Sequence, residues 1–421
     1  MTQLKQKRFS ASLDRFIVAA LAAMCVLLVL PAPAAQAQTY TVLHNFTNGS
    51  DGGFPQAGLV MDRAGNLYGT AVTGGTTGNG TVFKLEPFGS SWIFSPLYEF
   101  YGTSDGAAPT GPLTIGPDGA LYGTTLAGGY FQGEYCNDGG CGVVFQLRPR
   151  PTIPASSLTP WNETVLLAFN AADGNEPVYP QLLFDRAGNI YGTTQFGGGH
   201  VAGNVFELSP SAGGWTETVL YDGFDGPNGS QPYSGVVMDS AGNLYGTTSV
   251  GGEDGVVYEI SPTQYGWAET VLHDFDNGAD GGLSYGGLVM DQAGNLYGGT
   301  VSGGTGHCGV IYELSPSAGG WTFNMIYTFT SCPEGPYENL VLDAAGNLYG
   351  TTFGDGAYEA GMVFKLSKSN GVWSLTDLHD FSFGTEYFPY GAVTIGPNGN
   401  LYGTASGGGT YGHGAVWEIT P

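Results

Sequence analysis

Hydrophobic and polar residues alternate along the chain in short runs that are separated by glycine-rich turns. One ten-residue pattern, M-D-R-A-G-N-L-Y-G-T at residues 61–70, recurs with small changes throughout the sequence. Its copies place a tyrosine at Tyr68, Tyr122, Tyr191, Tyr245, Tyr297, Tyr349 and Tyr402. Most steps are 52–54 residues long, and one step of 69 residues carries insertions near residues 129–141 and 148–160. A fixed internal period of this size indicates a repeat architecture with seven units.

Each unit contains four short runs with the character of β-strands. In the fourth unit they are expected at residues 235–239, 243–248, 256–260 and 267–275, with glycine in the connections. Glycine supplies the positive φ that tight turns need, and no segment shows a helical period of useful length. Four antiparallel strands in about 50 residues are typical of a propeller blade. The sequence therefore predicts an all-β fold, a seven-bladed β-propeller of four-stranded antiparallel blades.

The two ends of the sequence predict how the ring closes. The last unit stops after its third strand, near residues 414–419, whereas residues 39–46 form a strand-like run with no unit of its own. This run, T-Y-T-V-L-H-N-F, matches the fourth strand of the fourth unit, E-T-V-L-H-D-F at residues 269–275. We expect the N-terminal strand to complete the last blade, because an open sheet edge invites aggregation.

The first 37 residues have the organisation of a signal peptide. A basic segment precedes an apolar run at residues 16–30, and A-Q-A at residues 35–37 supplies a cleavage signal. The sequence thus predicts a signal peptide over residues 1–37 and a single propeller domain over residues 38–421. A retained membrane anchor is the alternative, although the apolar run is short for a membrane span.

The predicted mature chain is strongly acidic. Residues 38–421 hold 35 aspartates and glutamates against seven lysines and arginines, a net charge of about −28. Such a surface repels nucleic acid and anionic membranes and favours cations or neutral ligands. Solubility alone also explains it. We expect a monomer with no nucleic-acid partner and no membrane span after signal cleavage.

The repeated pattern G-N-L-Y-G-T-T, a G-G loop, V-x-F/Y-E-L-S-P and a tryptophan resembles the exported bacterial tandem-repeat family called GloVer, noted for variable surface anchors. The resemblance covers residues 39–421. It implies an exported protein, and no activity is attached to that family in general. No anchor segment is evident at the C-terminus, so a secreted or periplasmic location is expected. More distantly, the order of strands is similar to kelch-like and NHL-like blades.

Candidate binding residues precede the first strand of each unit. In a propeller this position lies on the face that surrounds the channel mouth, and here it holds Tyr179, Tyr233, Tyr285, Tyr337 and Tyr390. Tyrosine offers an apolar ring and a polar hydroxyl, which suits sugars and peptides, although packing between blades is the alternative. Glu338 and Asn339 are further candidates, because other units have mostly small residues or proline there. The aromatic insertion at residues 130–135 could cover the mouth.

Acidic residues recur in the loops that lead into the units. Asp51, Asp105 and Asp280 are weak Ca²⁺ candidates, since carboxylates and nearby carbonyls suit that ion. The alternative is a turn in which the carboxylate accepts bonds from its own backbone. No other cofactor is predicted. Histidines in three loops (His200, His307 and His413) come from units that are not neighbours, which argues against a metal site.

The cysteines of the mature chain predict disulfides. Four remain once residues 1–37 are removed, and the candidates are Cys136, Cys141, Cys308 and Cys332. Exported chains with an even number of cysteines usually pair them. We expect two structural disulfides within loops and hairpins.

The sequence shows no catalytic motif. Nucleophile elbow, metalloprotease, Walker and dinucleotide-binding patterns are all missing from it. We therefore expect a non-catalytic binding or scaffold module for a carbohydrate or an extracellular protein at the channel mouth. The alternative is a carbohydrate-active enzyme, a glycoside hydrolase or polysaccharide lyase, that uses carboxylates around the axis. Glu338 is the one such carboxylate that the pattern places there.

Overall fold

The computed structural model describes residues 38–129, 136, 139–150, 160–330 and 335–420. Tyr40–Thr420 form one compact unit. The predicted signal peptide, residues 1–37, lies outside the described residues. The described part contains β-strands and one 3₁₀ turn, η1 (Gly226–Asn228), and none of its elements is a helix long and apolar enough to cross a membrane.

Seven four-stranded antiparallel sheets form the blades, whose strands we call A to D from the axis outward. Blade 1 consists of β2 (Val60–Met61), β3 (Leu67–Ala71), β4 (Thr81–Phe88) and β5 (Ser91–Glu99). Blade 2 consists of β6 (Thr114–Ile115), β7 (Leu121–Thr125), β8 (Val143–Pro149) and β9 (Trp161–Ala168). Blade 3 consists of β10 (Leu183–Phe184), β11 (Ile190–Thr194), β12 (Asn204–Ser211) and β13 (Gly214–Tyr221). Blade 4 consists of β14 (Val237–Met238), β15 (Leu244–Thr247), β16 (Val256–Thr263) and β17 (Gly266–Asp274). Blade 5 consists of β18 (Val289–Met290), β19 (Leu296–Gly299), β20 (Val310–Ser317) and β21 (Gly320–Thr328). Blade 6 consists of β22 (Val341–Leu342), β23 (Leu348–Thr352), β24 (Met362–Ser369) and β25 (Val372–Asp380).

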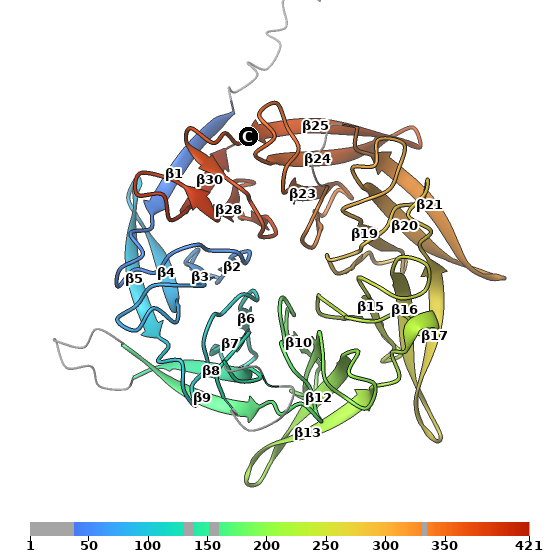
Figure 1. The fold of residues 1–421 in the computed structure, drawn as a ribbon. Helices are drawn as coiled ribbons and strands as arrows, with labels where there is room; N and C mark the ends of the chain where they lie inside the picture. The colour runs from blue at the N-terminus through green and yellow to red at the C-terminus, as the bar shows by residue number, and fades with distance from the viewer. Residues whose placement is uncertain (1–37, 130–135, 137–138, 151–159, 331–334, 421) are drawn as a thin grey trace, which may run out of the picture. The chain divides into compact units, whose positions relative to one another are not determined.

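Blade 7 is assembled from both ends of the unit. Its strands are β27 (Thr394–Ile395), β28 (Leu401–Ala405), β30 (Ala415–Thr420) and β1 (Thr39–Asn45), and the sheet order is β1-β30-β28-β27. A small extra sheet pairs β26 (Glu386–Tyr387) with β29 (Gly407–Gly408). Figure 1 shows the seven blades as a ring, with the short A strands near the axis and the long D strands at the rim. The predicted seven-bladed propeller, closed by the N-terminal strand, is therefore confirmed.

The closing junction uses the same kind of contact as the junction between blades 4 and 5. The Thr247 hydroxyl of blade 4 donates to the carbonyl of Gly286 in blade 5 at 2.9 Å, and the Thr404 hydroxyl of blade 7 donates to that of Ala57 in blade 1 at 2.8 Å. Hydrophobic clusters lie between neighbouring blades, and the one between blades 7 and 1 contains Phe46, Leu59, Leu67, Phe83, Leu85, Tyr402 and Val416. Since no blade can bury both faces alone, these inter-blade clusters are the core.

The repeated D-x-A-G-N-x-Y pattern builds the turn between strands A and B. In blade 4, Asp239 Oδ1 accepts the N–H groups of Ala241 and Asn243 at 2.8 and 2.9 Å, and its Oδ2 accepts the Tyr245 hydroxyl at 3.2 Å. Gly242 follows the turn with a φ of 90°. The same carboxylate geometry recurs at Asp62, Asp185, Asp291 and Asp343. These residues recur because the scaffold uses the same turn in five of the seven blades, while Gly-Pro-Asp-Gly and Gly-Pro-Asn-Gly take its place in blades 2 and 7.

The outer hairpins are longer than the sequence predicted. In blade 4 a turn was expected over residues 261–266, but β16 and β17 pair as far as Thr263 with Gly266. Gly266 has a φ of 124°, and the Thr263 hydroxyl donates to its carbonyl at 2.8 Å. A two-residue connection therefore suffices, because glycine adopts the backbone angles that a tight turn requires. The A strand is correspondingly short, Val237–Met238 instead of residues 235–239.

Candidate functional site

Each D–A loop ends in a residue that two blades hold by backbone hydrogen bonds. In blade 4 this loop-end residue is Gln231, whose φ is 59°. Its N–H donates to the carbonyl of Ala202 in blade 3 at 2.8 Å, and its carbonyl accepts from the N–H of Ser249 in blade 4 at 3.1 Å. The positive φ recurs at the loop-end residues Phe54, Ala108, Glu176, Leu283 and Phe388. Because the loops are fixed on both sides, the side chains that follow them are held in place at the axis.

Five tyrosines, one from each of blades 3 to 7, lie side by side around the axis. We call them the tyrosine arc: Tyr179, Tyr233, Tyr285, Tyr337 and Tyr390. Neighbouring ring centroids are 5.6, 4.8, 5.0 and 5.6 Å apart in this order. All five side chains are half-buried, so each ring packs on one part and faces solvent on another. The structure thus brings the five predicted tyrosines together into one aromatic surface.

Blades 1 and 2 supply polar residues at the equivalent position. The Tyr179 hydroxyl of blade 3 donates to Oε1 of Gln56 in blade 1 at 3.1 Å. Thr110 of blade 2 is buried, and its hydroxyl donates to the carbonyl of Val178. One end of the arc is therefore pinned by hydrogen bonds that cross between blades.

Glu338 lies directly after the arc residue of blade 6 and is 8% exposed. Its Oε2 accepts the N–H of Asn339 at 3.4 Å, while Oε1 has no hydrogen-bond partner among the described residues. Burial raises the pKa of the Glu338 carboxyl to about 8. Burial and then the charge of Glu338 raise the pKa of the Tyr179 hydroxyl. A buried oxygen without a partner is costly to the fold, so this position calls for a physical explanation.

Asn339 ties three blades together beneath the arc. Its Oδ1 accepts the N–H of Gly287 in blade 5 at 2.6 Å and the hydroxyl of Ser234 in blade 4 at 3.0 Å. A cavity of about 270 Å³ follows along the A strands, lined by Asn339 with Gln181, Val236 and neighbouring residues of blades 2 to 5. Asn339 thus has a structural task that its sequence position did not indicate.

Further aromatic rings extend the arc toward the rim of blade 7. Phe353 lies 4.7 Å from Tyr390 and stacks on the loop-end residue Phe388 at 4.3 Å. Phe383, 58% exposed, lies 5.5 Å from Phe388. Sequence reasoning missed these rings, although Phe353 stands where other blades have Val, Leu, Gln or Ser. That departure from the repeat was the signal that could have found it.

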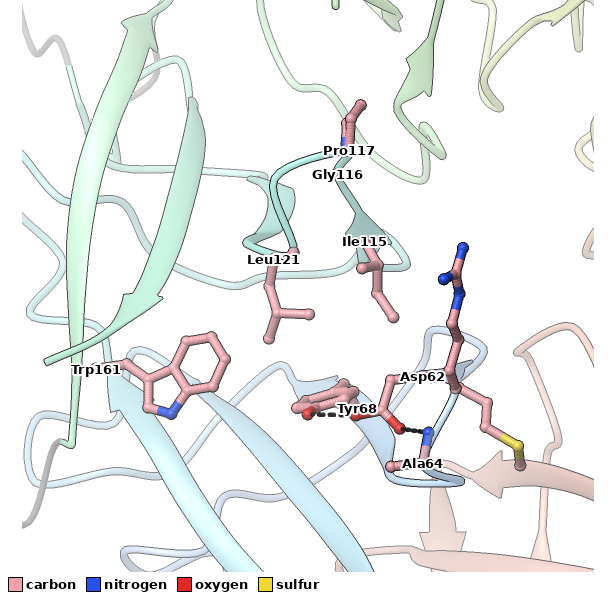
Figure 2. Close-up of a pocket in the computed structure, with 11 residues that line it drawn as sticks. Asp62, Ala64, Tyr68, Ile115, Gly116, Pro117, Leu121 and Trp161 are labelled. Carbon is pink, nitrogen blue, oxygen red and sulfur yellow. Dashed lines mark hydrogen bonds between the residues drawn. The ribbon is translucent and has the colours of Figure 1, made fainter. Parts of the chain in front are cut away.

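A larger cavity lies on the opposite face, between blades 1 and 2. It measures about 690 Å³ and is lined by Asp62, Tyr68, Ile115, Leu121, Trp161 and neighbours. In Figure 2 the Asp62 carboxylate accepts hydrogen bonds from Ala64 and Tyr68, at 2.8 and 3.0 Å. Smaller cavities with a Tyr and a Trp recur between blades 7 and 1 and between blades 2 and 3. Because repeat-level scaffold residues line all three, we place the candidate site at the arc instead.

The acidic D–A loops form turns stabilised by their own carboxylates. Asp51 accepts the Thr47 N–H at 2.9 Å, and Asp105 accepts the Tyr101 N–H at 2.8 Å. Asp280 lies 2.9 Å from Nε2 of a strand D histidine. In the part of the chain that the structure describes, no three His, Cys, Asp or Glu residues gather closely enough to hold a metal ion. Ca²⁺ binding at Asp51, Asp105 and Asp280 stays a prediction.

Three half-buried glutamates lie between the outer strands of neighbouring blades, two residues after the tryptophan of strand D: Glu163, Glu217 and Glu269. Each has one carboxyl oxygen without a hydrogen-bond partner among the described residues. Burial, aided by the charge of Asp173, raises the pKa of Glu217 to about 8. Burial raises the pKa of the other two to about 7. Blade 1 has Phe94 at this place, which stacks on His44 at 3.8 Å.

The cysteine prediction is confirmed for one pair. Cys136 and Cys141 form a disulfide in the B–C loop of blade 2, with their Cα atoms 4.8 Å apart. Cys308 is buried and disulfide-bonded, and its predicted partner, Cys332, lies outside the described residues. The aromatic insertion at residues 130–135 lies outside them too.

The sequence matches a family model described as the Gloeobacter/Verrucomicrobia repeat. The match falls in three overlapping stretches, residues 32–158, 130–335 and 254–421, which together span the propeller. No curated protein matches the sequence.

Solved structures match the fold at low sequence identity. The extracellular domain of a protein described as a hybrid two-component system of B. thetaiotaomicron matches with a TM-score of 0.57 and 11% identity over 91% of this chain, which spans 42% of that one. An ulvan lyase of polysaccharide lyase family 25, bound to -[GlcA(1-4)Rha3S]-, matches with a TM-score of 0.50 and 10% identity over 87% of this chain and 94% of the lyase. A protein described as a 6-phosphogluconolactonase of Bacteroides uniformis matches with a TM-score of 0.50 and 17% identity, over 83% and 90% of the two chains. At such identities the matches establish the fold alone.

Proposed function

The chain belongs to the Gloeobacter/Verrucomicrobia repeat family, and on this premise we propose that it is an exported, non-catalytic propeller that binds a carbohydrate at the tyrosine arc. The observation that carries the proposal is the arc itself, five half-buried rings in contact around the axis. Ligand sites combine aromatic walls with a few fixed polar groups, and aromatic rings with hydroxyls suit the apolar faces and hydroxyls of sugars. Gln56 and Glu338 supply such polar groups beside the arc.

The aromatic extension favours an elongated ligand over a small one. Phe353, Phe388 and Phe383 continue the arc outward along blade 7 and its junction with blade 6. An oligosaccharide can place successive units on successive rings, so its affinity can accumulate along this path. One solved neighbour is a lyase bound to a saccharide, and a carbohydrate partner for this chain is an inference in keeping with that relative.

The proposal of export rests on the predicted signal peptide and on the disulfide. Residues 1–37 have the pattern of a secretory signal, and the Cys136–Cys141 disulfide suits an oxidising compartment. One neighbouring structure is an extracellular domain. We propose a secreted or periplasmic location.

A carbohydrate-active enzyme is the second candidate, and Glu338 is the observation that favours it. A carboxyl whose pKa is about 8 can donate a proton near neutral pH. A glycoside hydrolase needs a second carboxylate roughly 5–10 Å away. Among the described residues, burial is what raises the Glu338 pKa, and no neighbouring carboxylate contributes to it. We therefore rank binding above catalysis.

The experiment is a glycan-array screen of residues 38–421, followed by titration calorimetry on the strongest hit. Tyr285→Ala and Tyr337→Ala should each weaken binding about tenfold or more, because they remove buried aromatic contacts. Tyr265→Ala is the matched control, since Tyr265 is 91% exposed in the C–D turn on the opposite face. Equal binding by all three variants, or no glycan bound at all, would contradict the proposal. Release of reducing ends or unsaturated sugars would instead identify the enzyme.

A further inference from the structure

We propose that the carbohydrate recognised at the tyrosine arc carries a protonated amino group and that Glu338 is its counter-ion. This inference rests on the proposed function and names the chemical class of its ligand. It assigns to one buried carboxylate a role that packing does not explain.

The first support is the environment of Glu338. Its side chain is more than nine-tenths buried, and Oε1 has no hydrogen-bond partner among the described residues. None of the ion pairs within the described part of the chain involves it. A charged carboxylate buried without a cation is costly, so the carboxyl stays protonated until a cation binds beside it. An ammonium group on the ligand would donate to Oε1 and balance the charge.

The second support is the sign of charge on this face. The D–A and B–C loops, which make up the face, contain no lysine or arginine in the sequence. The seven basic residues of residues 38–421 lie on the A–B turns, on strand C or just after it: Arg63, Lys84, Arg148, Arg150, Arg186, Lys365 and Lys368. The same loops carry carboxylates such as Asp51, Asp105, Asp222 and Asp280. Such a face attracts cations and repels sulfated or uronic saccharides.

The third support is the arc around the carboxyl. The faces of aromatic rings attract cations that lie within about 6 Å of the ring centroid, and recognition by several rings around one ammonium is well known in proteins. The rings of the arc follow one another at 4.8–5.6 Å. Glu338 comes directly after Tyr337 in the chain, and its charge acts on the Tyr179 hydroxyl. An amino sugar satisfies both parts of this site, with its ring on a tyrosine and its ammonium toward the carboxyl.

Binding should release a proton. Burial keeps the Glu338 carboxyl protonated near neutral pH when the site is empty. The Asn339 N–H donates to Glu338 Oε2 at 3.4 Å, and the Glu338 charge acts on the Tyr179 hydroxyl. A ligand ammonium that pairs with the carboxylate requires this proton to leave for the solvent. Each complex therefore releases up to one proton.

The test compares two oligosaccharides that differ only in charge, the β-1,4-linked glucosamine tetrasaccharide and its fully N-acetylated counterpart. Titrations run at pH 5.5, where the amines are protonated, in two buffers of different ionisation enthalpy. The wild-type protein should bind the amine form at least tenfold more tightly and release close to one proton. Glu338→Gln should keep the affinity for the acetylated form but lose both the preference and the proton release.

Glu253→Gln provides the matched control, because it removes an exposed carboxylate from a B–C loop of the same face. The preference should survive in this variant and in 0.5 M NaCl, since a buried pair is screened less than surface charge. A preference that Glu338→Gln retains, or that Glu253→Gln reduces equally, would overturn the inference and assign the effect to general surface charge. Equal affinity for both oligosaccharides would overturn it while leaving the proposed function in place. Failure to bind either one, or any glycan, would overturn both.

Discussion

Removing one ring from the N-terminal strand should destabilise the whole propeller. Phe46 follows β1 and is fully buried, with ring centroids 5.2 Å from Phe83 and 5.9 Å from Phe94 in blade 1. Its N–H donates to the carbonyl of Gly414 at 3.0 Å, so the residue joins blade 7 to blade 1. Phe46→Ala removes a buried side chain and leaves a cavity, which should lower the free energy of unfolding by about 3–5 kcal/mol.

The assay is equilibrium unfolding in guanidinium chloride followed by tryptophan fluorescence. Phe275→Ala is the matched comparison, because Phe275 holds the same place within blade 4 and is fully buried too. It should cost a similar amount, whereas Thr41→Ala, on the exposed side of β1, should change stability by less than about 0.5 kcal/mol. The closure argument would be refuted if Phe46→Ala behaved like Thr41→Ala while Phe275→Ala cost several kcal/mol. An unchanged melting temperature after deletion of residues 38–47 would refute it as well.

Other parts of the fold can be tested in the same way. Asp239→Ala removes the carboxylate that organises an A–B turn and should cost about 1–3 kcal/mol by calorimetry, while the exposed neighbour Ser240→Ala should cost almost nothing. Replacing Cys136 and Cys141 by serine opens a short loop and should cost about 2 kcal/mol; two reactive thiols at these positions in the native protein would contradict the disulfide. The pKa of Glu217 is higher in the fold than in the unfolded chain, so its contribution to stability is complete below pH 4.5 and is lost as pH rises toward 8. Glu217→Gln should therefore flatten the fall in stability between pH 5 and 8, which is followed as the melting temperature. One titrating group changes the slope of the unfolding free energy by at most about 1.4 kcal/mol per pH unit. An unchanged slope would show that this carboxyl ionises freely.

The sequence predicted the ring because closely similar patterns of strand and turn residues recur in all seven units. Asp239, Gly242 and Tyr245 act within one turn, so their spacing along the chain is enough to identify their purpose. The same holds for the strand at residues 39–46, whose resemblance to the other D strands predicted where it belongs. A pattern whose residues interact within one turn or one strand can be interpreted from the sequence alone.

The site could be predicted only in part, because its geometry depends on contacts between blades. The position of the arc followed from the repeat, but the stacking of Tyr285 on Tyr337 at 5.0 Å did not. Neither did the bonds of Asn339 to blades 4 and 5, or the lack of a partner for Glu338 Oε1 within the described part of the chain. The contacts join residues 52 and 105 positions apart, and no pattern within one unit records them.

The return of β1 to blade 7 has a consequence for the order in which the protein folds. The side chain of Asn45 at the end of β1 accepts the N–H of Thr410 at 2.8 Å, across 365 residues of sequence. Blades 1 to 6 can each form from consecutive strands as the chain emerges, whereas the last blade must wait for its partner strands to be made. Blade 7, which closes the ring, should therefore form last. A circular permutant that carries β1 after β30 would turn this slow, long-range step into the formation of a local hairpin with the same final fold.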